Sequence, residues 1–380
     1  MINQVLDTGV HSLVKGKMPR GCEFCVRGEK LVLFVTGLCP LKCFYCPVSD
    51  HKMYKDVIYA NEWKIENFDN ILEEAKLTDA KGTGITGGDP LVVIDRVCEY
   101  IKKLKNEFGK DFHIHLYTTL QLVTEERLKK LFDAGLDEIR FHPNLDDTKL
   151  WHRLSLAKMF SWHCGVEIPC IPGKKKEIMK LIEFAKDKVD FLNLNELELS
   201  ERKPEEFQCR GFHTRNSLTY AIQGSSELAR EVMGEAKCDN LTLYFCTAKL
   251  KDAIQMKKRI QRRAKNVKLP FDVETDEGLL IRGVLYLPDL TPGFKYHEIL
   301  DKTKKEDFLP KLEIVRKGIV KFYKLDNDDI VVDDIKLRLL CDQKFLKKNA
   351  GIIKKRFKLN PAIVEEYPTR DALEVDVRFL

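Results

Sequence analysis

Short apolar and β-branched runs alternate with longer amphipathic stretches along the first half of the chain. The runs predicted as strands are residues 31–36, 82–86, 112–118, 137–143, 164–171 and 189–195. Helical periodicity fills the gaps between them, at residues 65–76, 93–108, 124–135 and 175–188. Six strand–helix units in a row predict an α/β fold, a parallel sheet curled into a partial, TIM-like (β/α)6 barrel. In such folds the chemistry lies at the carboxyl ends of the strands.

The pattern changes towards the carboxyl half. Residues 247–268 predict a basic amphipathic helix that ends before Pro270, with Asp252 its only acid. After it, shorter strand-like runs with interspersed helix predict a smaller α+β domain. We therefore expect four parts: a cysteine-bearing segment (1–29), the barrel (30–246), a basic linking helix (247–270) and the C-terminal domain (271–380).

The composition of the chain indicates the cellular compartment in which the protein works. The chain has 380 residues, twelve of them cysteine, and a formal net charge of +6. Because we see neither a signal peptide nor an apolar run long enough to span a membrane, we expect a cytoplasmic protein whose thiols are reduced or bind metal. The positive charge permits an anionic partner.

Three cysteines fall on one short loop after the first strand. Cys39, Cys43 and Cys46 have the spacing C-x3-C-x2-C. Closed zinc sites and electron-carrying cubanes normally have four protein ligands, so a set of three indicates a metal with one open corner. A zinc site completed by His51 is the alternative.

Polar or small residues also mark the ends of later strands. Gly87, Gly88 and Asp89 follow the second strand, Thr118 ends the third, Glu167 lies on the fifth, and Asn193 and Asn195 end the sixth. Paired glycines let the backbone approach a ligand closely. Three of these features also have a purely structural interpretation: an ordinary turn at 87–90, a helix cap at Thr118, and an ion pair of Glu167 with Arg140 or His163.

The cysteine spacing, the aromatic Tyr45 before the last cysteine, and the Gly-Gly-Asp-Pro segment resemble the radical S-adenosylmethionine (SAM) superfamily. The resemblance covers roughly residues 30–200 and is nearest to activating enzymes of the pyruvate formate-lyase type. It implies a [4Fe–4S] cluster on Cys39, Cys43 and Cys46, with SAM chelating the fourth iron. An electron from an external ferredoxin or flavodoxin would then cleave SAM, and the resulting 5′-deoxyadenosyl radical would abstract hydrogen from a substrate.

The resemblance also implies which residues contact SAM. Gly87, Gly88 and Asp89 would contact the methionyl amino group, with Asp89 standing where the family usually has glutamate. The ribose, the carboxylate and the adenine would be contacted by Thr118, Glu167, Asn195 and Tyr45.

A second cysteine group precedes the barrel. Cys22 and Cys25 form a C-x2-C pair with Gly28 close behind, the shape of a metal knuckle. We expect Cys246 to complete a second centre, an auxiliary [4Fe–4S] cluster ahead of zinc. Cys238 is a further candidate of the same rank, Cys209 and His213 are the alternative ligands, and the alternative interpretation is a pair of reduced thiols. The cysteines expected in the core are Cys98, Cys164, Cys170 and Cys341.

The substrate class stays open between RNA and protein. The basic helix and a second basic stretch at 344–358 favour RNA, as in tRNA modification. The alternative is a protein-modifying or glycyl-radical-activating enzyme. A structural iron–sulfur or zinc module is the non-enzyme alternative.

Overall fold

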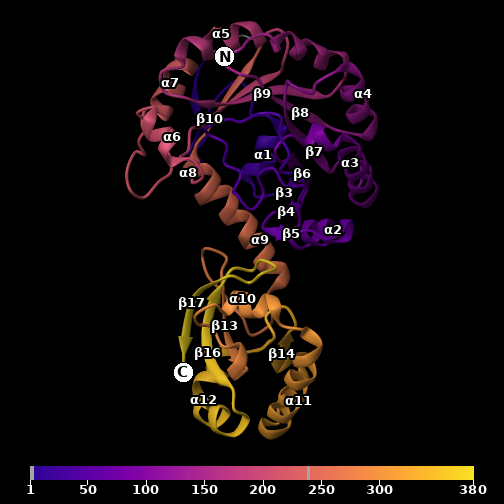
Figure 1. Ribbon diagram of the computed structural model, residues 1–380, viewed down its shortest axis with the longest axis vertical. Helices are drawn as coiled ribbons and strands as arrows, with labels where there is room; N and C mark the ends of the chain where they lie inside the picture. Colours follow the sequence, from indigo (N-terminus) through magenta and orange to yellow (C-terminus); the bar gives the residue numbers. More distant parts are fainter. Residues whose placement is uncertain (1–3, 238–239) are drawn as a thin grey trace. The chain divides into compact units, whose positions relative to one another are not determined.

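The computed structural model describes residues 4–237 and 240–380 and divides into two compact units, Met1–Arg259 and Ile260–Leu380 (Figure 1). The division falls inside the basic helix. Within the described residues, no helix combines the length and the apolar character needed to cross a bilayer.

All six predicted barrel strands form, and each pairs in parallel with the next one along the chain. A further parallel strand follows the sixth. In chain order these strands are β3 (Lys30–Phe34), β6 (Gly82–Thr86), β7 (His113–Thr119), β8 (Glu138–His142), β9 (His163–Cys170), β10 (Phe191–Glu196) and β11 (Thr242–Cys246). The partial barrel is therefore confirmed, with one strand more than the prediction.

Helices cover the outer side of these strands (Figure 1). They are α2 (Phe68–Leu77), α3 (Ile94–Phe108), α4 (Glu125–Ala134), α5 (Lys175–Ala185), α6 (Pro204–Cys209) and α7 (Ser225–Glu235), with 3₁₀ turns η1 (Pro90–Val93) and η2 (Trp151–Met159). Gly135 ends α4 with a left-handed φ of 101°, which a glycine adopts without strain.

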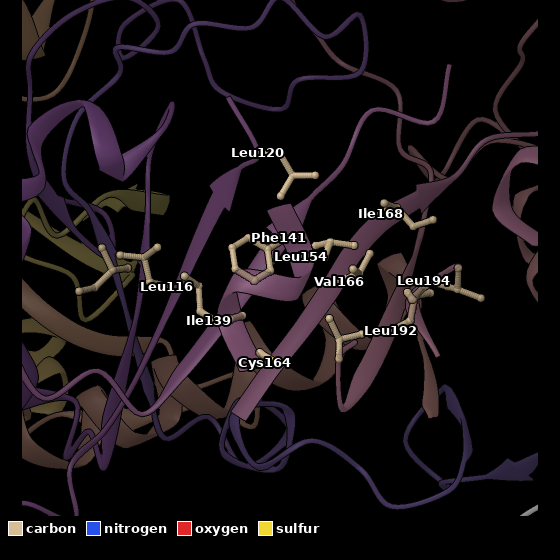
Figure 2. Packing of buried hydrophobic residues seen from close by; sticks show 14 of the residues in the cluster. Leu116, Leu120, Ile139, Phe141, Leu154, Cys164, Val166, Ile168, Leu192 and Leu194 are labelled. Atoms are coloured by element: carbon tan, nitrogen blue, oxygen red, sulfur yellow. The ribbon is translucent and has the colours of Figure 1, made fainter. Parts of the chain in front are cut away.

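Side-chain alternation divides each strand between two environments. Ile139 and Phe141 of β8 belong to the apolar cluster outside the strands, together with Val166 and Leu192 (Figure 2). Glu138, Arg140 and His142 alternate with Ile139 and Phe141 along β8 and therefore point to the interior of the ring. The barrel interior is polar, and its outer layer is the hydrophobic core.

The N-terminal segment belongs to the barrel unit. Strand β1 (Leu6–Asp7) pairs with β2 (Ser12–Lys15), and β2 pairs antiparallel with β11. Helix α1 (Arg20–Val26) then lies inside the ring of strands, where the Gly21 amide donates to Glu138 Oε2 at 3.0 Å (Figure 1). At the other edge of the sheet, β3 pairs with a short hairpin, β4 (Tyr59–Ala60) and β5 (Trp63–Lys64).

The basic helix is a continuous helical stretch of three parts: α8 (Ala248–Leu250), a π-helical turn η3 (Lys251–Met256) and α9 (Lys257–Val267). Some of its cations have partners within the barrel unit. Lys251 pairs with Glu198, Arg259 pairs with Glu62, and Lys258 Nζ donates to the Val26 carbonyl at 3.0 Å. Part of the basic face is thus used to dock the helix.

The C-terminal unit is a split β-α-β-β-α-β fold. Its antiparallel sheet has the order β14-β15-β13-β16, with β17 added at one edge and β12 paired with β13. The strands are β12 (Val273–Glu274), β13 (Leu280–Tyr286), β14 (Ile330–Asp333), β15 (Arg338–Cys341), β16 (Asn360–Glu366) and β17 (Glu374–Phe379). The helices and 3₁₀ turns are η4 (Pro288–Leu290), α10 (Tyr296–Lys302), α11 (Lys305–Tyr323), η5 (Asn327–Asp329) and α12 (Gln343–Phe357). The predicted α+β class is confirmed.

Candidate active site

The three cysteines of the C-x3-C-x2-C motif lie on the loop after β3, half-buried and not in disulfides. The base of this loop is closed by backbone bonds: Gly37 N donates to the Lys55 carbonyl at 2.8 Å, and Tyr54 N donates to the Gly37 carbonyl at 2.9 Å. A pocket of ≈ 420 Å³ opens beside Cys39. The loop is therefore fixed at its base and open to a ligand beside Cys39.

The Gly-Gly-Asp-Pro segment binds the backbone of the cysteine loop. Gly88 N donates to the Thr36 carbonyl at 2.7 Å, and Asp89 N donates to the Leu38 carbonyl at 2.8 Å. A Cβ at Gly88 would lie 2.3 Å from the Leu38 carbonyl oxygen, and one at Gly87 would lie 2.4 Å from that of Thr36. The close approach that these glycines permit is thus to the protein's own backbone; their contact with SAM stays a prediction.

Asp89 is fully buried, and its carboxylate is fully engaged. It accepts hydrogen bonds from Leu91 N at 3.0 Å, Thr118 Oγ1 at 2.8 Å and Thr119 Oγ1 at 2.6 Å. Thr118 therefore binds Asp89 and does not cap a helix. This carboxylate links the Gly-Gly-Asp-Pro segment to β7, and any contact of Asp89 or Thr118 with SAM stays a prediction.

Tyr45 connects the cysteine loop to β8. Its hydroxyl lies 2.8 Å from His142 Nε2, and His142 Nδ1 lies 2.8 Å from the Glu167 carbonyl oxygen. Because a carbonyl only accepts, Nδ1 carries the proton, and because burial lowers the pKa of His142 the ring stays neutral. Nε2 is then the acceptor, and Tyr45 donates to it.

Glu167 is at the centre of a polar network in the barrel interior. It accepts from Arg140 Nη1 at 2.9 Å, Asn193 Nδ2 at 3.0 Å and Asn195 Nδ2 at 2.9 Å. Burial alone would raise the pKa of Glu167, but Arg140 and the two amides outweigh it and hold that pKa below its usual range. The predicted ion pair with Arg140 is confirmed, and Glu167 is an anion at neutral pH.

The second cysteine group reaches the same interior. Cys22 Sγ accepts from Arg140 Nη2 and from Asn193 Nδ2, both at 3.4 Å. Cys246 packs in one cluster with Cys22 and Tyr244. Burial raises the pKa of the Cys246 thiol to about 12; Lys251 lowers it, and Glu167 and Cys25 add to the rise.

The remaining cysteines separate into core and surface positions. Cys164, Cys170 and Cys341 are buried, as predicted, and Cys98 on α3 is half-buried. Cys209 is exposed at the end of α6. Cys238 lies outside the described residues.

Neither cysteine group forms a preformed site for a single metal ion among the described residues. In residues 4–237 and 240–380, no three His, Cys, Asp or Glu side chains converge in metal-holding geometry, and His51 does not join the cysteine loop in such a group. The donor chemistry of the loop nevertheless fits a [4Fe–4S] cluster, because it offers three thiols and no fourth.

Several site residues had not been predicted. Arg140 was foreseen only as a partner of Glu167, Asn193 was placed at the end of the sixth strand without a role, and His142 was missed. The available signal was the alternation of Glu138, Arg140 and His142 with Ile139 and Phe141, which places polar side chains on one face of a strand. Ser200 Oγ donates to the Cys46 carbonyl at 2.8 Å. It follows β10 in an irregular segment with no periodic signal.

Comparison with known proteins identifies the family. The radical SAM superfamily matches residues 33–190. A protein of Methanocaldococcus jannaschii, provisionally described as a glycyl-radical enzyme activating enzyme, is 42% identical over 369 residues, which cover 95% of this chain and 92% of that protein. A GTP 3′,8-cyclase assigned in the same organism is 30% identical over 33% of this chain and 40% of its own length.

Two solved structures are similar at low identity. Methylornithine synthase has a TM-score of 0.38 and 16% identity, covering 57% of this chain and 69% of the other. Streptococcus suis SuiB, solved with SAM, has a TM-score of 0.39 and 16% identity, covering 58% of this chain and 50% of the other. By the superfamily match and the long M. jannaschii alignment, this chain belongs to the radical SAM superfamily and is an enzyme that uses a [4Fe–4S] cluster and SAM.

Proposed function

We propose that this radical SAM enzyme activates a partner protein by abstracting hydrogen from a glycine Cα of that partner. The observation that carries the proposal is the 42% identity to the provisionally described activating enzyme. That alignment covers 95% of the chain and so includes most of both units. The RNA alternative has no comparable support among these relatives.

Cys39, Cys43 and Cys46 are the proposed cluster ligands. When bound, the cluster and SAM supply a one-electron cleavage that yields a hydrogen-abstracting radical. The chain contributes the position of the thiols: the Gly88 amide donates to the Thr36 carbonyl, the Asp89 amide donates to the Leu38 carbonyl, and Ser200 Oγ donates to the Cys46 carbonyl. These bonds fix the backbone of the loop, and Leu41 N donates to Cys39 Sγ at 3.4 Å.

Glu167 is the proposed acceptor for a SAM hydroxyl or ammonium group. Its carboxylate is ionised and is oriented by Arg140, Asn193 and Asn195. Tyr45 is held by His142, so its ring is fixed beside the cysteine loop. An external ferredoxin- or flavodoxin-type donor is the proposed source of the electron.

The source of the abstracted hydrogen tests this function. Cells of the organism that makes the enzyme are grown on glycine deuterated at Cα, and their anaerobic extract is added to reduced enzyme and SAM. We expect deuterium in 5′-deoxyadenosine, lost when the extract is treated with protease and retained after ribonuclease. Deuterium transfer from RNA labelled at its ribose, with none from glycine, would contradict the proposal.

A further inference from the structure

Three thiols and an imidazole that the proposed reaction does not use belong to the barrel interior. Cys22 and Cys25 come from α1, Cys246 ends β11, and His115 lies in β7. Cys22 and Cys246 pack in one cluster with Tyr244 and Leu250. The pairing of β2 with β11 brings the N-terminal segment to this part of the barrel. It places Ser12 opposite Cys246, and α1 begins a few residues after β2 ends.

Tight packing holds α1 in the ring. A Cβ at Gly21 would lie 2.5 Å from Arg140 Nη2, 2.7 Å from Glu138 Oε1 and 3.0 Å from His115 Nδ1. The position before Cys22 therefore admits only glycine unless these side chains move. This packing puts Cys22 beside β7 and β8.

The imidazole of His115 has a free nitrogen on the side of α1. Its Nε2 lies 3.2 Å from the Tyr117 hydroxyl, whereas Nδ1 is buried and has no hydrogen-bond partner among the described residues. His115 is 1% exposed, so water does not reach that nitrogen from bulk solvent. A buried, unpartnered ring nitrogen whose opposite nitrogen is held by a hydrogen bond is typical of a metal-binding histidine.

The surroundings of Cys22 also suit a metal-bound sulfur. Arg140 and Asn193 both direct N–H groups at Cys22 Sγ, at 3.4 Å. Such donors stabilise a thiolate and offset the negative charge of a thiolate-rich site. Asn193 Oδ1 has no partner of its own among the described residues.

We propose that Cys22, Cys25, Cys246 and His115 bind a single thiophilic divalent cation, zinc by this donor set, which fastens α1 to the barrel. Three thiolates and one imidazole make a closed tetrahedral structural site. The close packing around Gly21 favours one ion over a cubane. The four donors do not form a preformed metal-holding group among the described residues, so binding a single ion needs their side chains to rotate.

The test uses the full chain with Cys39, Cys43 and Cys46 all changed to Ala, which removes the proposed cluster ligands. We expect this variant to retain about one zinc per chain and, after exchange with cobalt(II), to show thiolate-to-cobalt charge-transfer absorption. Further change of Cys22 and Cys25 to Ala should remove both signals. Added to the variant that lacks Cys39, Cys43 and Cys46, either Cys246→Ser or His115→Gln should weaken cobalt binding by at least about tenfold. Cys98→Ala, a half-buried thiol on α3, is the matched control and should change nothing.

Three results would overturn the assignment. The first is that the variant lacking Cys39, Cys43 and Cys46 folds but takes up neither zinc nor cobalt. The second is metal binding that survives the loss of Cys22 and Cys25, and the third is about four irons with sulfide on these thiols, which would mean a cubane. If the Cys22/Cys25 variant does not fold, the single Cys246→Ser and His115→Gln variants decide, with folding checked by thermal unfolding.

Discussion

The two cysteine groups of the barrel unit are held in different ways. Cys39, Cys43 and Cys46 lie on a half-buried loop whose base is fixed by backbone hydrogen bonds to the Gly-Gly-Asp-Pro segment. Cys22 is buried on a short helix and is surrounded by the side chains of Arg140 and Asn193. Backbone bonds at the base leave the first group open to a ligand, whereas side-chain packing closes the second. The same ligand chemistry can thus serve a reactive site in one setting and a structural site in the other.

The largest expected effect is loss of one thiol from the open group. Cys43→Ala should abolish 5′-deoxyadenosine formation and lower the iron content by about four per chain, because a cubane on two thiolates is not retained. The measurements are iron analysis and product assay after anaerobic reconstitution with dithionite and SAM. Cys98→Ala is the control; equal loss in both variants would contradict a specific role for the loop.

Gly88→Val tests whether the backbone holds the open group. The new Cβ would lie 2.3 Å from the Leu38 carbonyl oxygen, so the base of the loop must move. We expect the variant to lose both cluster and SAM binding, with a free energy of unfolding lower by about 3 kcal/mol, as for other overpacked sites. Gly234→Ala on α7, where an added Cβ would make no close contact, should keep cluster and SAM binding and should not lower the free energy of unfolding, because alanine is the better helix former. A variant that loses SAM binding but keeps a normal cluster spectrum would mean that Gly88 contacts the ligand instead.

Mildly acidic pH should lower the free energy of unfolding through two buried histidines of the barrel interior, His113 and His115. Burial lowers the pKa of His113 to about 2. Burial is also the main reason why the pKa of His115 lies well below its usual value. Below pH 6.5 the unfolded chain binds protons at these rings and the folded chain does not, so stability is complete above this pH and falls as the pH drops. Between pH 7.5 and 5.5 the free energy of unfolding should fall by about 1.4 kcal/mol per ring, or about 3 kcal/mol for both.

Urea unfolding at the two pH values measures this loss. Replacing His113 with Gln should remove about 1.4 kcal/mol of this fall. A free energy that stays flat over this interval, or that rises towards pH 5.5, would show that the interior histidines are charged or exposed.

Ser200→Ala should have the smallest effect. It removes one hydrogen bond, from Ser200 Oγ to the Cys46 carbonyl, while the backbone bonds at the base of the loop remain. We expect a loss of about 1 kcal/mol in unfolding free energy, full cluster loading and a modest fall in SAM cleavage. Loss of the cluster in this variant would mean that the end of the loop, and not its base, controls ligand geometry.

Sequence periodicity predicted the barrel strands and the cysteine loop because both are local patterns. Residues 82–86 form β6 as predicted, and Gly135 ends α4. The position of α1 was not predictable in this way. It depends on β2 pairing with β11, more than two hundred residues away, which leaves no local signal.

The partners of the site residues were harder to predict than the residues themselves. The two glycines at 87 and 88 indicated a close approach, but only the structure shows that the nearest atoms are the carbonyls of Thr36 and Leu38. Asp89 was predicted as a SAM contact, and only the structure shows that its carboxylate also binds Thr118 and Thr119 of β7; the contact with SAM stays a prediction. In the C-terminal unit the elements were predictable as α+β, whereas the order β14-β15-β13-β16 is a property of tertiary pairing.

The central claim is that three thiolates on the loop after β3 leave one iron free to bind SAM. Electron paramagnetic resonance of the reduced, reconstituted enzyme tests it most directly, because a ligand on the open iron changes the spectrum of the reduced cluster. We expect a [4Fe–4S] signal that shifts when SAM is added, in wild type and in Cys22→Ala alike, and no such signal in Cys43→Ala. A wild-type signal that is identical with and without SAM would contradict the claim.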